Sequence, residues 1–265
     1  MLRNSSKKAP VVDAVDADED NAPVRVRPWV LAIVLPLWVA GSFILASVFI
    51  NFLLDFLIFI GVSFSGINAI IFNTSAAVVI YGLTLLIAVM LPKILFRGAI
   101  TSREDLGLQR LPNWQDIFVT PVGFIAYFVL SAVLTAVAMS FSWFDVDQVQ
   151  NTGFSGVSFG YEYMLAFFAL VILAPVAEEI LFRGYLYGKL KKYVPIWFAI
   201  ILSSALFGLA HGAWNVGIDT FALGVVLCVV REITGSLWPS ILLHSLKNGL
   251  AYYLLFINPV ILHTL

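Results

Sequence analysis

The chain alternates long apolar segments with short polar connections, a pattern that is typical of proteins that cross a membrane several times. A membrane-spanning helix needs about 20 predominantly apolar residues. Candidate spans of roughly this kind lie at 29–53, 71–92, 117–140, 162–182, 195–213, 218–233 and 237–257. The segment 54–70 either lengthens the first helix or forms a re-entrant or interfacial segment. We therefore predict an all-α fold, a polytopic transmembrane helix bundle of about seven spans, or eight if 54–70 contains one.

The composition supports this class and excludes others. Hydrophobic residues make up 61% of the 265 residues and charged residues 12%, and the mean hydropathy is +0.96. Soluble domains carry about 25% charged residues, so no water-soluble fold could bury this much apolar surface. The net charge of −1, without a basic stripe, excludes nucleic-acid binding by bulk electrostatics. The lone cysteine, Cys228, excludes an internal disulfide, and we expect it to be a small buried residue.

The distribution of basic residues predicts how the spans are oriented. Cytoplasmic loops carry an excess of Lys and Arg. With seven spans, one side holds 14 of the 15 basic residues, in the N-terminal tail and the connections 93–116, 183–194 and 231–236. The other side holds none, in the connections 54–70, 141–161 and 214–217 and the C-terminal end. We expect a cytoplasmic N-terminus, with residues 1–27 as a disordered cytoplasmic tail and 28–265 as a single transmembrane domain.

Several ionisable or strongly polar residues interrupt the apolar segments of the C-terminal half. A charged group near the centre of a bilayer costs about 2.5–3.5 kcal/mol on insertion scales, so such residues usually face a cavity and serve a function. Three different predicted helices contribute them: Glu178 and Glu179, then His211, then His244, Lys247 and Asn248. The polar groups of three helices therefore predict one site inside the membrane.

The spacing of these residues indicates which of them can act together. Glu179 and Arg183 are four residues apart, so they share a helix face and can form an ion pair. Glu178 points about 100° away and is left without that partner. A simple interpretation is an ion pair at a helix end; the functional one makes Glu178 the working carboxylate.

Two further pairs recur at helical spacing. Phe207 and His211 are one turn apart, as are His244 and Asn248. Each pair alone is compatible with ordinary packing or with hydrogen bonds between helices. Together with the carboxylates they favour a functional site over chance.

These residues also carry a family resemblance. Residues 178–183 read EEILFR and fit EExxxR, residues 207–211 read FGLAH and fit FxxxH, and residues 244–248 read HSLKN and fit HxxxN. Residues 231–249, REITGSLWPSILLHSLKNG, are similar to the family's approach to its last histidine. The chain resembles the CPBP family, which comprises CAAX prenyl proteases of the Rce1 type and bacteriocin-processing or Abi proteins. The resemblance covers a catalytic core at about 161–257.

The resemblance implies an intramembrane glutamic endopeptidase that hydrolyses a peptide bond of a membrane-associated or lipidated protein or peptide. Glu178 would be the general base that removes a proton from a water held between it and His211. His244 and Asn248 would donate hydrogen bonds to the oxyanion of the tetrahedral intermediate. No cofactor is implied by this mechanism.

Supporting roles follow from the same resemblance. Glu179 and Arg183 would orient their helix and shape the charge around Glu178. Phe207 would pack beside His211 and restrict its ring.

Two alternatives remain open at this point. Glu178, His211 and His244 are also a reasonable ligand set for Zn or Fe, which would make the protease metal-dependent, although HExxH is absent. The same Glu/His cluster could instead be the proton relay of an ion-coupled transporter, although the internal repeats typical of transporters are absent.

Further expectations concern single residues. Lys247 either holds a substrate carboxylate or pairs with Asp219 or Glu232, and His263 receives no role. If every span is centred in the bilayer, Glu178 lies about 7 Å to one side of the centre and His211 about 9 Å to the other.

We expect the lipid bilayer itself as a partner, the plasma membrane in a bacterium and the endoplasmic reticulum in a eukaryote. The sequence predicts no oligomeric state.

Overall fold

The computed structural model describes residues 27–95, 101–148, 152–154 and 156–259, and within these ranges all regular structure is helical. The predicted all-α class is confirmed. The predicted tail, apart from Arg27, lies outside the described residues, as does His263. 

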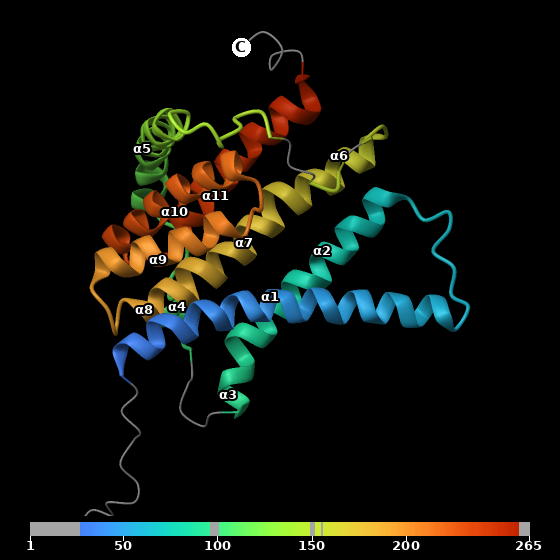
Figure 1. The fold of residues 1–265 in the computed structure, drawn as a ribbon, viewed down its shortest axis with the longest axis horizontal. Helices are drawn as coiled ribbons and strands as arrows, with labels where there is room; N and C mark the ends of the chain where they lie inside the picture. Colours follow the sequence, from blue (N-terminus) through green and yellow to red (C-terminus); the bar gives the residue numbers. More distant parts are fainter. Residues whose placement is uncertain (1–26, 96–100, 149–151, 155, 260–265) are drawn as a thin grey trace, which may run out of the picture.

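Each predicted apolar segment corresponds to one helix or one continuous series of helical segments (Figure 1). The α-helices are α1 (Pro28–Phe59), α2 (Ala69–Leu85), α3 (Leu91–Leu95), α4 (Arg103–Leu106), α5 (Trp114–Ala138), α6 (Gly160–Phe167), α7 (Ala174–Glu179), α8 (Gly188–Leu190), α9 (Ile196–Leu209), α10 (Trp214–Thr234) and α11 (Trp238–Tyr252). Four π-helical segments continue them: Leu86–Met90, Phe168–Leu173, Ile180–Tyr187 and Tyr253–Ile257. Because α1 extends to Phe59, the first part of 54–70 lengthens the first helix.

Four helices of the described ranges are long and apolar enough to cross a membrane. They are Trp29–Phe59, Ala69–Met90, Trp114–Ala138 and Gly160–Leu190. Helix α9 is apolar but has only 14 residues, and α10 contains Asp219, Arg231 and Glu232. The protein is thus a polytopic integral membrane protein, and the total of seven spans stays a prediction.

The connections predicted to be cytoplasmic lie together at one end of the bundle. Gln109 donates its side-chain amide to the carbonyl of Gly235 at 3.2 Å, which joins the segment before α5 to the turn before α11. Lys192, after α8, forms an ion pair with Asp105 of α4 at 2.5 Å. This ammonium holds the pKa of the Asp105 carboxyl below its ordinary value. 

The connections predicted for the opposite side also meet one another. The Asn215 amide at the start of α10 donates to the carbonyls of Val146 and Gln148, both at 2.8 Å. Asn68, before α2, donates to Glu162 in the first turn of α6. The grouping of the connections into two sets, inferred from basic residues alone, is therefore confirmed.

The short helix α4 packs closely against the helix that carries the two neighbouring glutamates. A Cβ at Gly184 would lie 3.2 Å from the Leu106 side chain, and one at Gly188 would lie 3.0 Å from the Asp105 carbonyl. The two glycines are four residues apart and so present one face without side chains. They allow α4, in the polar connection before α5, to lie directly against the π-helical segment Ile180–Tyr187 and α8.

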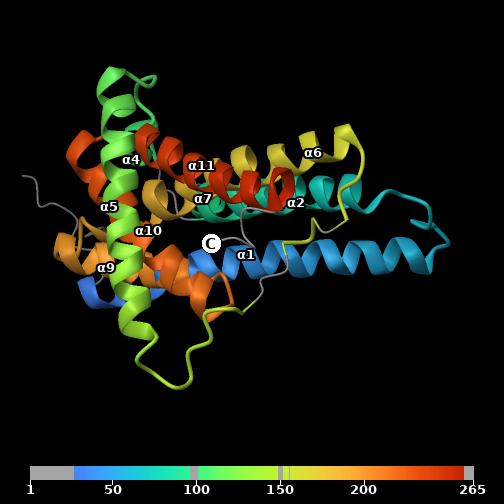
Figure 2. The same ribbon diagram turned by 90° about the horizontal axis from the view of Figure 1, so that it is seen from above.

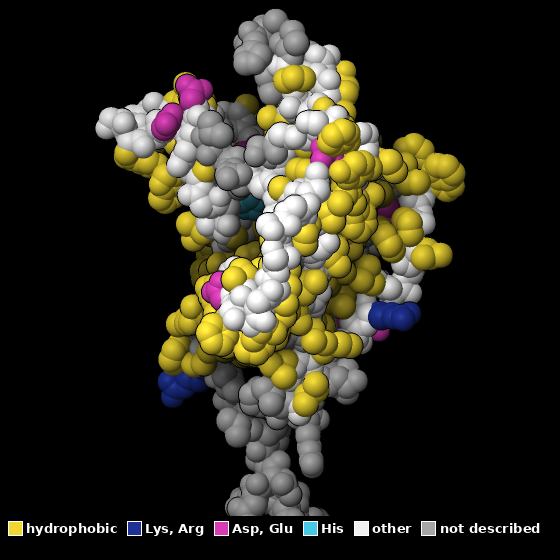
Figure 3. Space-filling view, turned by 90° about the vertical axis from the view of Figure 1, so that its right-hand side faces the viewer, with side chains coloured by type: hydrophobic (Ala, Val, Ile, Leu, Met, Phe, Trp, Pro, Cys, Tyr) yellow, Lys and Arg dark blue, Asp and Glu magenta, His cyan; other side chains and the backbone are white. Residues whose placement is uncertain are grey.

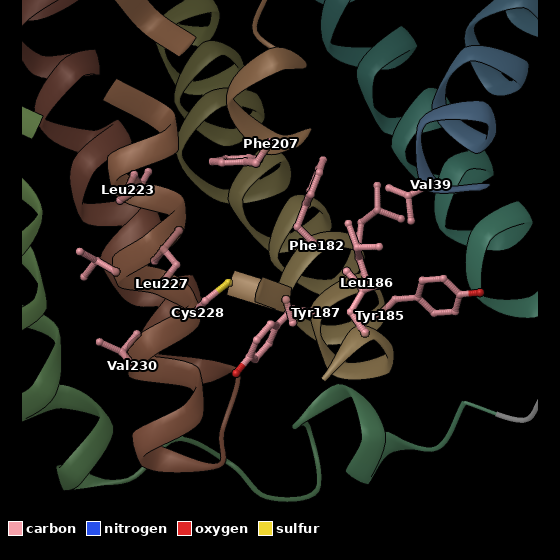
Figure 4. Close-up of a cluster of buried hydrophobic side chains, with 14 of the residues drawn as sticks. Val39, Phe182, Tyr185, Leu186, Tyr187, Phe207, Leu223, Leu227, Cys228 and Val230 are labelled. Carbon is pink, nitrogen blue, oxygen red and sulfur yellow. The ribbon is translucent and has the colours of Figure 1, made fainter. Parts of the chain in front are cut away.

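A cluster of buried apolar side chains lies between this helix, α9, α10 and α1 (Figure 4). Leu186, Leu223 and Leu227 are fully buried within it, and so is Cys228, as predicted. Helix α5 packs against α10 and α11 on another side, and Figure 2 shows it crossing the other helices. Large apolar side chains cover much of the outer surface, as expected for contact with lipid (Figure 3). 

Gly107 ends α4 in a left-handed conformation with φ of 77°, and an added Cβ would lie 2.5 Å from the Arg231 guanidinium. We expect Gly107→Ala to lower the free energy of unfolding by more than the about 1–2 kcal/mol of left-handed strain alone. Gly235→Ala is the matched control, because Gly235 also has a positive φ but open space around it. Thermal unfolding of the purified variants in detergent measures both. Equal losses of unfolding free energy in the two variants would show that the contact with Arg231 adds nothing to the cost of Gly107→Ala.

Candidate active site

The four predicted catalytic residues line one cavity of about 1280 Å³. Glu178 comes from α7, His211 from the turn after α9, and His244 and Asn248 from α11. Part of one histidine side chain is visible from outside in the space-filling view (Figure 3). The polar groups of three helices therefore meet in one place, as the sequence predicts.

The two neighbouring glutamates have different environments. The Glu179 side chain is fully buried, and its Oε1 accepts a hydrogen bond from Arg183 Nη1 at 2.9 Å. The same Oε1 lies 2.9 Å from His244 Nδ1. Glu178 instead remains partly accessible at the cavity wall. The predicted ion pair is present, and it leaves Glu178 as the carboxylate that faces the cavity.

The contact with Glu179 determines what the His244 ring can do. A carboxylate only accepts hydrogen bonds, so Nδ1 must carry the proton between the two groups. The other ring nitrogen, Nε2, lies 3.8 Å from Glu178 Oε2. With Nδ1 protonated, Nε2 accepts a hydrogen bond in the neutral ring and donates one only in the imidazolium form. His244 thus lies between the carboxylates of Glu178 and Glu179.

A tyrosine from the N-terminal half completes the environment of Glu178. The Tyr81 hydroxyl of α2 donates to Glu178 Oε1 at 2.5 Å. This bond fixes one carboxylate oxygen and leaves Oε2 toward His244. Tyr81 was not among the residues predicted from the sequence. The available signal was that Tyr81 is the only tyrosine in the predicted span 71–92.

Phe207 contacts three members of the site. Its ring meets that of His211 edge to face at 5.0 Å and that of His244 at 5.7 Å. The Arg183 guanidinium carbon lies 4.2 Å from the centre of the same ring. The predicted packing of Phe207 beside His211 is observed, and Phe207 additionally links His211 to the buried ion pair.

The His211 ring is also oriented by the backbone. Its Nδ1 lies 2.8 Å from the Phe207 carbonyl, which can only accept, so Nδ1 donates and Nε2 bears the lone pair in the neutral ring. Glu178 and His211 line the same cavity despite their predicted difference in depth. The expectation assumed that every helix is centred in the bilayer, whereas α9 ends at Leu209 and places His211 in a turn.

Asn248 is held by one of the π-helical segments. Its side-chain amide donates to the carbonyl of Leu170 at 2.9 Å. A primary amide has two N–H donors, so one is used here and the second can serve the cavity. Because Asn248 and His244 are one turn apart and both line the cavity, their predicted common face is confirmed.

Lys247 pairs with one of the two acidic residues considered for it. Its Nζ lies 3.2 Å from Asp219 Oδ2. Glu232 is instead bound by Lys191 and by the Tyr187 hydroxyl, both at 2.7 Å. The Glu232 alternative was therefore wrong, since that residue lies at the other end of α10, beside α8.

The structure gives no support to the predicted metal-ligand set. Within the described ranges, no group of three His, Cys, Asp or Glu side chains is close enough to hold a metal ion. Glu178, His211 and His244 line the cavity without forming such a group in this arrangement. Metal dependence stays a prediction, and chelation tests it directly.

Fold and site together define a polytopic, all-α integral membrane protein with a cavity whose ionisable groups come mainly from its C-terminal half. Residues 160–250 match the family described as "Type II CAAX prenyl endopeptidase Rce1-like". The match confirms the resemblance inferred from the three motifs, and it contains Glu178, His211, His244 and Asn248 as well as Glu179, Arg183 and Phe207.

Two curated proteins are similar to part of the chain. "Membrane-embedded CAAX protease MroQ" of Staphylococcus aureus (strain USA300) is 30% identical over 98 residues, which is 35% of this chain and 40% of that protein. "Putative membrane peptidase YdiL" of Bacillus subtilis (strain 168) is 30% identical over 77 residues, 29% of this chain and 32% of that protein. The matched part thus spans less than half of either relative. No solved structure matches the chain.

The buried ion pair leads to a test of stability. Arg183→Met would leave the Glu179 carboxylate buried without its cation, so we expect the free energy of unfolding to fall by about 3–5 kcal/mol. Lys191→Met, which removes the partly exposed pair with Glu232, should cost about 0–1 kcal/mol. Denaturant unfolding in detergent compares the two. Similar losses of unfolding free energy in the two variants would contradict a stabilising role for the buried Glu179–Arg183 pair.

Proposed function

We propose that this protein is an intramembrane endopeptidase that uses Glu178 to activate water against a peptide bond of a membrane-associated or lipidated protein or peptide. The observation that carries the proposal is the position of the Glu178 carboxylate. It faces His244 Nε2 across 3.8 Å, in a cavity that His211 and Asn248 also line. A potential general base, Glu178, and a potential hydrogen-bond donor, His244, therefore face each other in the cavity.

Glu178 would serve as base and then as acid. Its Oε2 would take a proton from a water, and the resulting hydroxide would attack the carbonyl carbon of the scissile bond. The tetrahedral intermediate would collapse as the protonated Glu178 delivers that proton to the leaving amine. Tyr81, by binding Oε1, would hold the carboxylate with Oε2 toward the reacting atoms.

His211 would help to position the water. In its neutral form Nδ1 donates to the Phe207 carbonyl, so Nε2 is an acceptor for one hydrogen of a water molecule. Glu178 would accept the other. A water held by two acceptors has its oxygen lone pairs directed away from both, toward an incoming carbonyl carbon.

His244 and Asn248 would stabilise the negative charge that develops on the carbonyl oxygen. The Asn248 amide has a second N–H for this purpose, and a doubly protonated His244 ring would supply Nε2–H. Removal of one such donor typically costs about 2.7–4 kcal/mol of transition-state stabilisation. Glu179 would orient the ring by accepting from Nδ1.

The comparisons support a protease, but they do not identify its substrate. The matched family is described as CAAX prenyl endopeptidases, and one relative is named as a CAAX protease. A lipidated peptide is therefore the first substrate class to test, and an unlipidated one the second. No observation favours the transporter alternative.

The first test replaces the proposed base. Glu178→Gln keeps the shape of the side chain but cannot take a proton, so we expect cleavage of quenched fluorescent peptides to fall by about 10²–10⁴-fold. Asp55→Asn, at an exposed carboxylate of α1, is the control and should cleave at the parental rate. An unchanged rate in Glu178→Gln would rule out this mechanism.

The same assay separates the glutamate mechanism from the metal-dependent alternative. Parent activity should be insensitive to a chelator, since the mechanism needs only protein groups and water. Loss of activity on chelation, with recovery on addition of zinc, would establish the metal alternative in its place.

Tyr81 offers a test of positioning. A hydrogen bond to a charged group contributes about 1.5–3 kcal/mol, so Tyr81→Phe should lower kcat by about tenfold or more and leave KM nearly unchanged. Tyr253→Phe, at an exposed ring beyond α11, should change neither constant. A rise in KM without a fall in kcat would show that Tyr81 contacts the substrate instead.

A further inference from the structure

A pocket of about 460 Å³, separate from the polar groups of the active-site cavity, lies between α5, α9 and α10. Helices α5 and α9 each pack along α10 but make little contact with each other. The space between them on α10 is lined by residues of all three helices, among them Ala138 of α5, Ala205 of α9 and Phe221 of α10. We call it the α5–α9 pocket. Its volume lies within the range of about 300–1,000 Å³ that is typical of ligand sites.

The lining of the α5–α9 pocket selects an apolar ligand. Among the described residues, every side chain that lines it is aliphatic or aromatic, or belongs to a glycine. A polypeptide segment would bring backbone N–H and C=O groups, which need partners in an apolar environment. A hydrocarbon chain brings no such groups. The lining therefore favours a hydrocarbon chain over a peptide.

The pocket continues the lipid-facing surface of α5, a helix long and apolar enough to cross the membrane. Exposed apolar side chains follow one another along this helix at spacings of three and four residues: Val122, Ile125, Val129, Val133 and Val137. The last of them, Val137, also lines the pocket. The acyl chains that cover this row in a bilayer therefore have direct access to the pocket.

Two tryptophans indicate on which side of the membrane the pocket lies. Trp143 and Trp214 both line it and are more than half exposed, and their rings meet edge to face at 5.5 Å. Tryptophan is enriched where the hydrocarbon core meets the headgroups. Both residues belong to the connections predicted to lie opposite the basic ones. A lipid with its headgroup on that side can therefore direct an acyl chain into the pocket.

The pocket also adjoins the turn that carries His211. Leu209 lines both the pocket and the active-site cavity. Gly208, Gly212 and Ala213, which flank His211, line the pocket as well. Within the turn, the His211 amide donates to the Gly208 carbonyl at 3.1 Å, and the Ala213 amide donates to the His211 carbonyl at 2.9 Å. The turn thus has the proposed catalytic groups on one side and the pocket on the other.

We propose that the α5–α9 pocket binds one acyl chain of a bilayer phospholipid, and that the bound chain holds residues 208–213, and with them His211, in the arrangement described above. An apolar hollow loses dispersion contacts unless atoms fill it, and acyl chains are the apolar groups that surround this helix in a membrane. Binding of the chain is independent of the proposed function. Only its effect on cleavage rests on that function.

Photochemical cross-linking locates the chain. The full-length protein in dodecyl maltoside receives increasing fractions of a phosphatidylglycerol with a diazirine in the middle of one acyl chain. After irradiation, peptide mass spectrometry maps the cross-links. We expect those at Leu209 to saturate at a low lipid fraction, because one site is filled. Those at Val122 and Ile125, on the open surface of α5, should rise in proportion to the lipid.

Variants assign the saturable cross-link to the pocket. Ala138→Phe places a ring inside it and Val137→Trp a larger ring at its exposed edge. Overpacking of this kind should lower cross-linking at Leu209 by about tenfold or more. Val129→Trp, on the exposed row of α5 but outside the pocket, is the matched control for Val137→Trp and should cross-link as the parent does.

Hydrogen exchange tests the effect on His211 without relying on catalysis. Added phosphatidylglycerol should slow exchange of the backbone amides of residues 208–213 in the parent and in Val129→Trp, but not in Val137→Trp. If the parent cleaves peptides, lipid should also raise its cleavage rate and leave that of Val137→Trp unchanged. If it cleaves none, the proposed function fails, and cross-linking and exchange still decide this inference.

Three results would count against the proposal. Cross-links at Leu209 that rise in proportion to the lipid, as at Val122, would show ordinary surface contact and overturn it. Displacement of the saturable cross-link by a lipidated peptide, but not by its unlipidated form, would assign the pocket to the substrate and overturn it as well. Saturable cross-linking with unchanged exchange at residues 208–213 would overturn the effect on His211.

Discussion

The His244 and Phe207 rings of the site are tied to one buried cation, Arg183. Its guanidinium is fully buried, pairs with Glu179 at 2.9 Å and lies over the Phe207 ring at 4.2 Å. A Cβ at Gly224 would lie 3.0 Å from its Nη2, so α10 can pass this close only with a glycine there. A buried charge is tolerated when it is paired. Here Glu179 of α7 and the Phe207 ring of α9 compensate it, while Gly224 lets α10 pass close beside it, so the cation constrains how these helices meet.

Glu179 transmits this constraint to His244, one of the proposed catalytic groups. One oxygen, Oε1, is shared between Arg183 and His244, so the orientation of the His244 ring depends on the ion pair. Adjacent residues on a helix point about 100° apart. Of two neighbouring carboxylates, one is therefore directed into the protein and organises the structure, while Glu178 is directed into the cavity. The doubled glutamate in the sequence thus supplies two different roles within one helical turn.

Much of this arrangement could be predicted from the sequence, because it is local. The apolar segments give the helices, and spacings of four residues give the Glu179–Arg183 pair, the Phe207–His211 contact and the shared face of His244 and Asn248. Contacts between helices could not be predicted in the same way. The Tyr81–Glu178 bond depends on how α2 is rotated about its axis, and the choice between Asp219 and Glu232 for Lys247 depends on where α10 and α11 cross. The spacing of residues along one helix predicts neither the rotation of α2 nor the point where α10 and α11 cross.

The π-helical segments on both sides of α7 were also beyond prediction, and they explain how the site tolerates polar contacts inside a membrane. In lipid, backbone polar groups need partners within the protein, and widened turns change which carbonyls are accessible. The Leu170 carbonyl in the first segment accepts from Asn248, and the Phe182 carbonyl in the second accepts from Ser203. Each widened turn is thus bound by a side chain from another helix. These bonds hold α9 and α11 against the glutamate helix, so the same irregular backbone that surrounds Glu178 also determines where His211 and Asn248 lie relative to it.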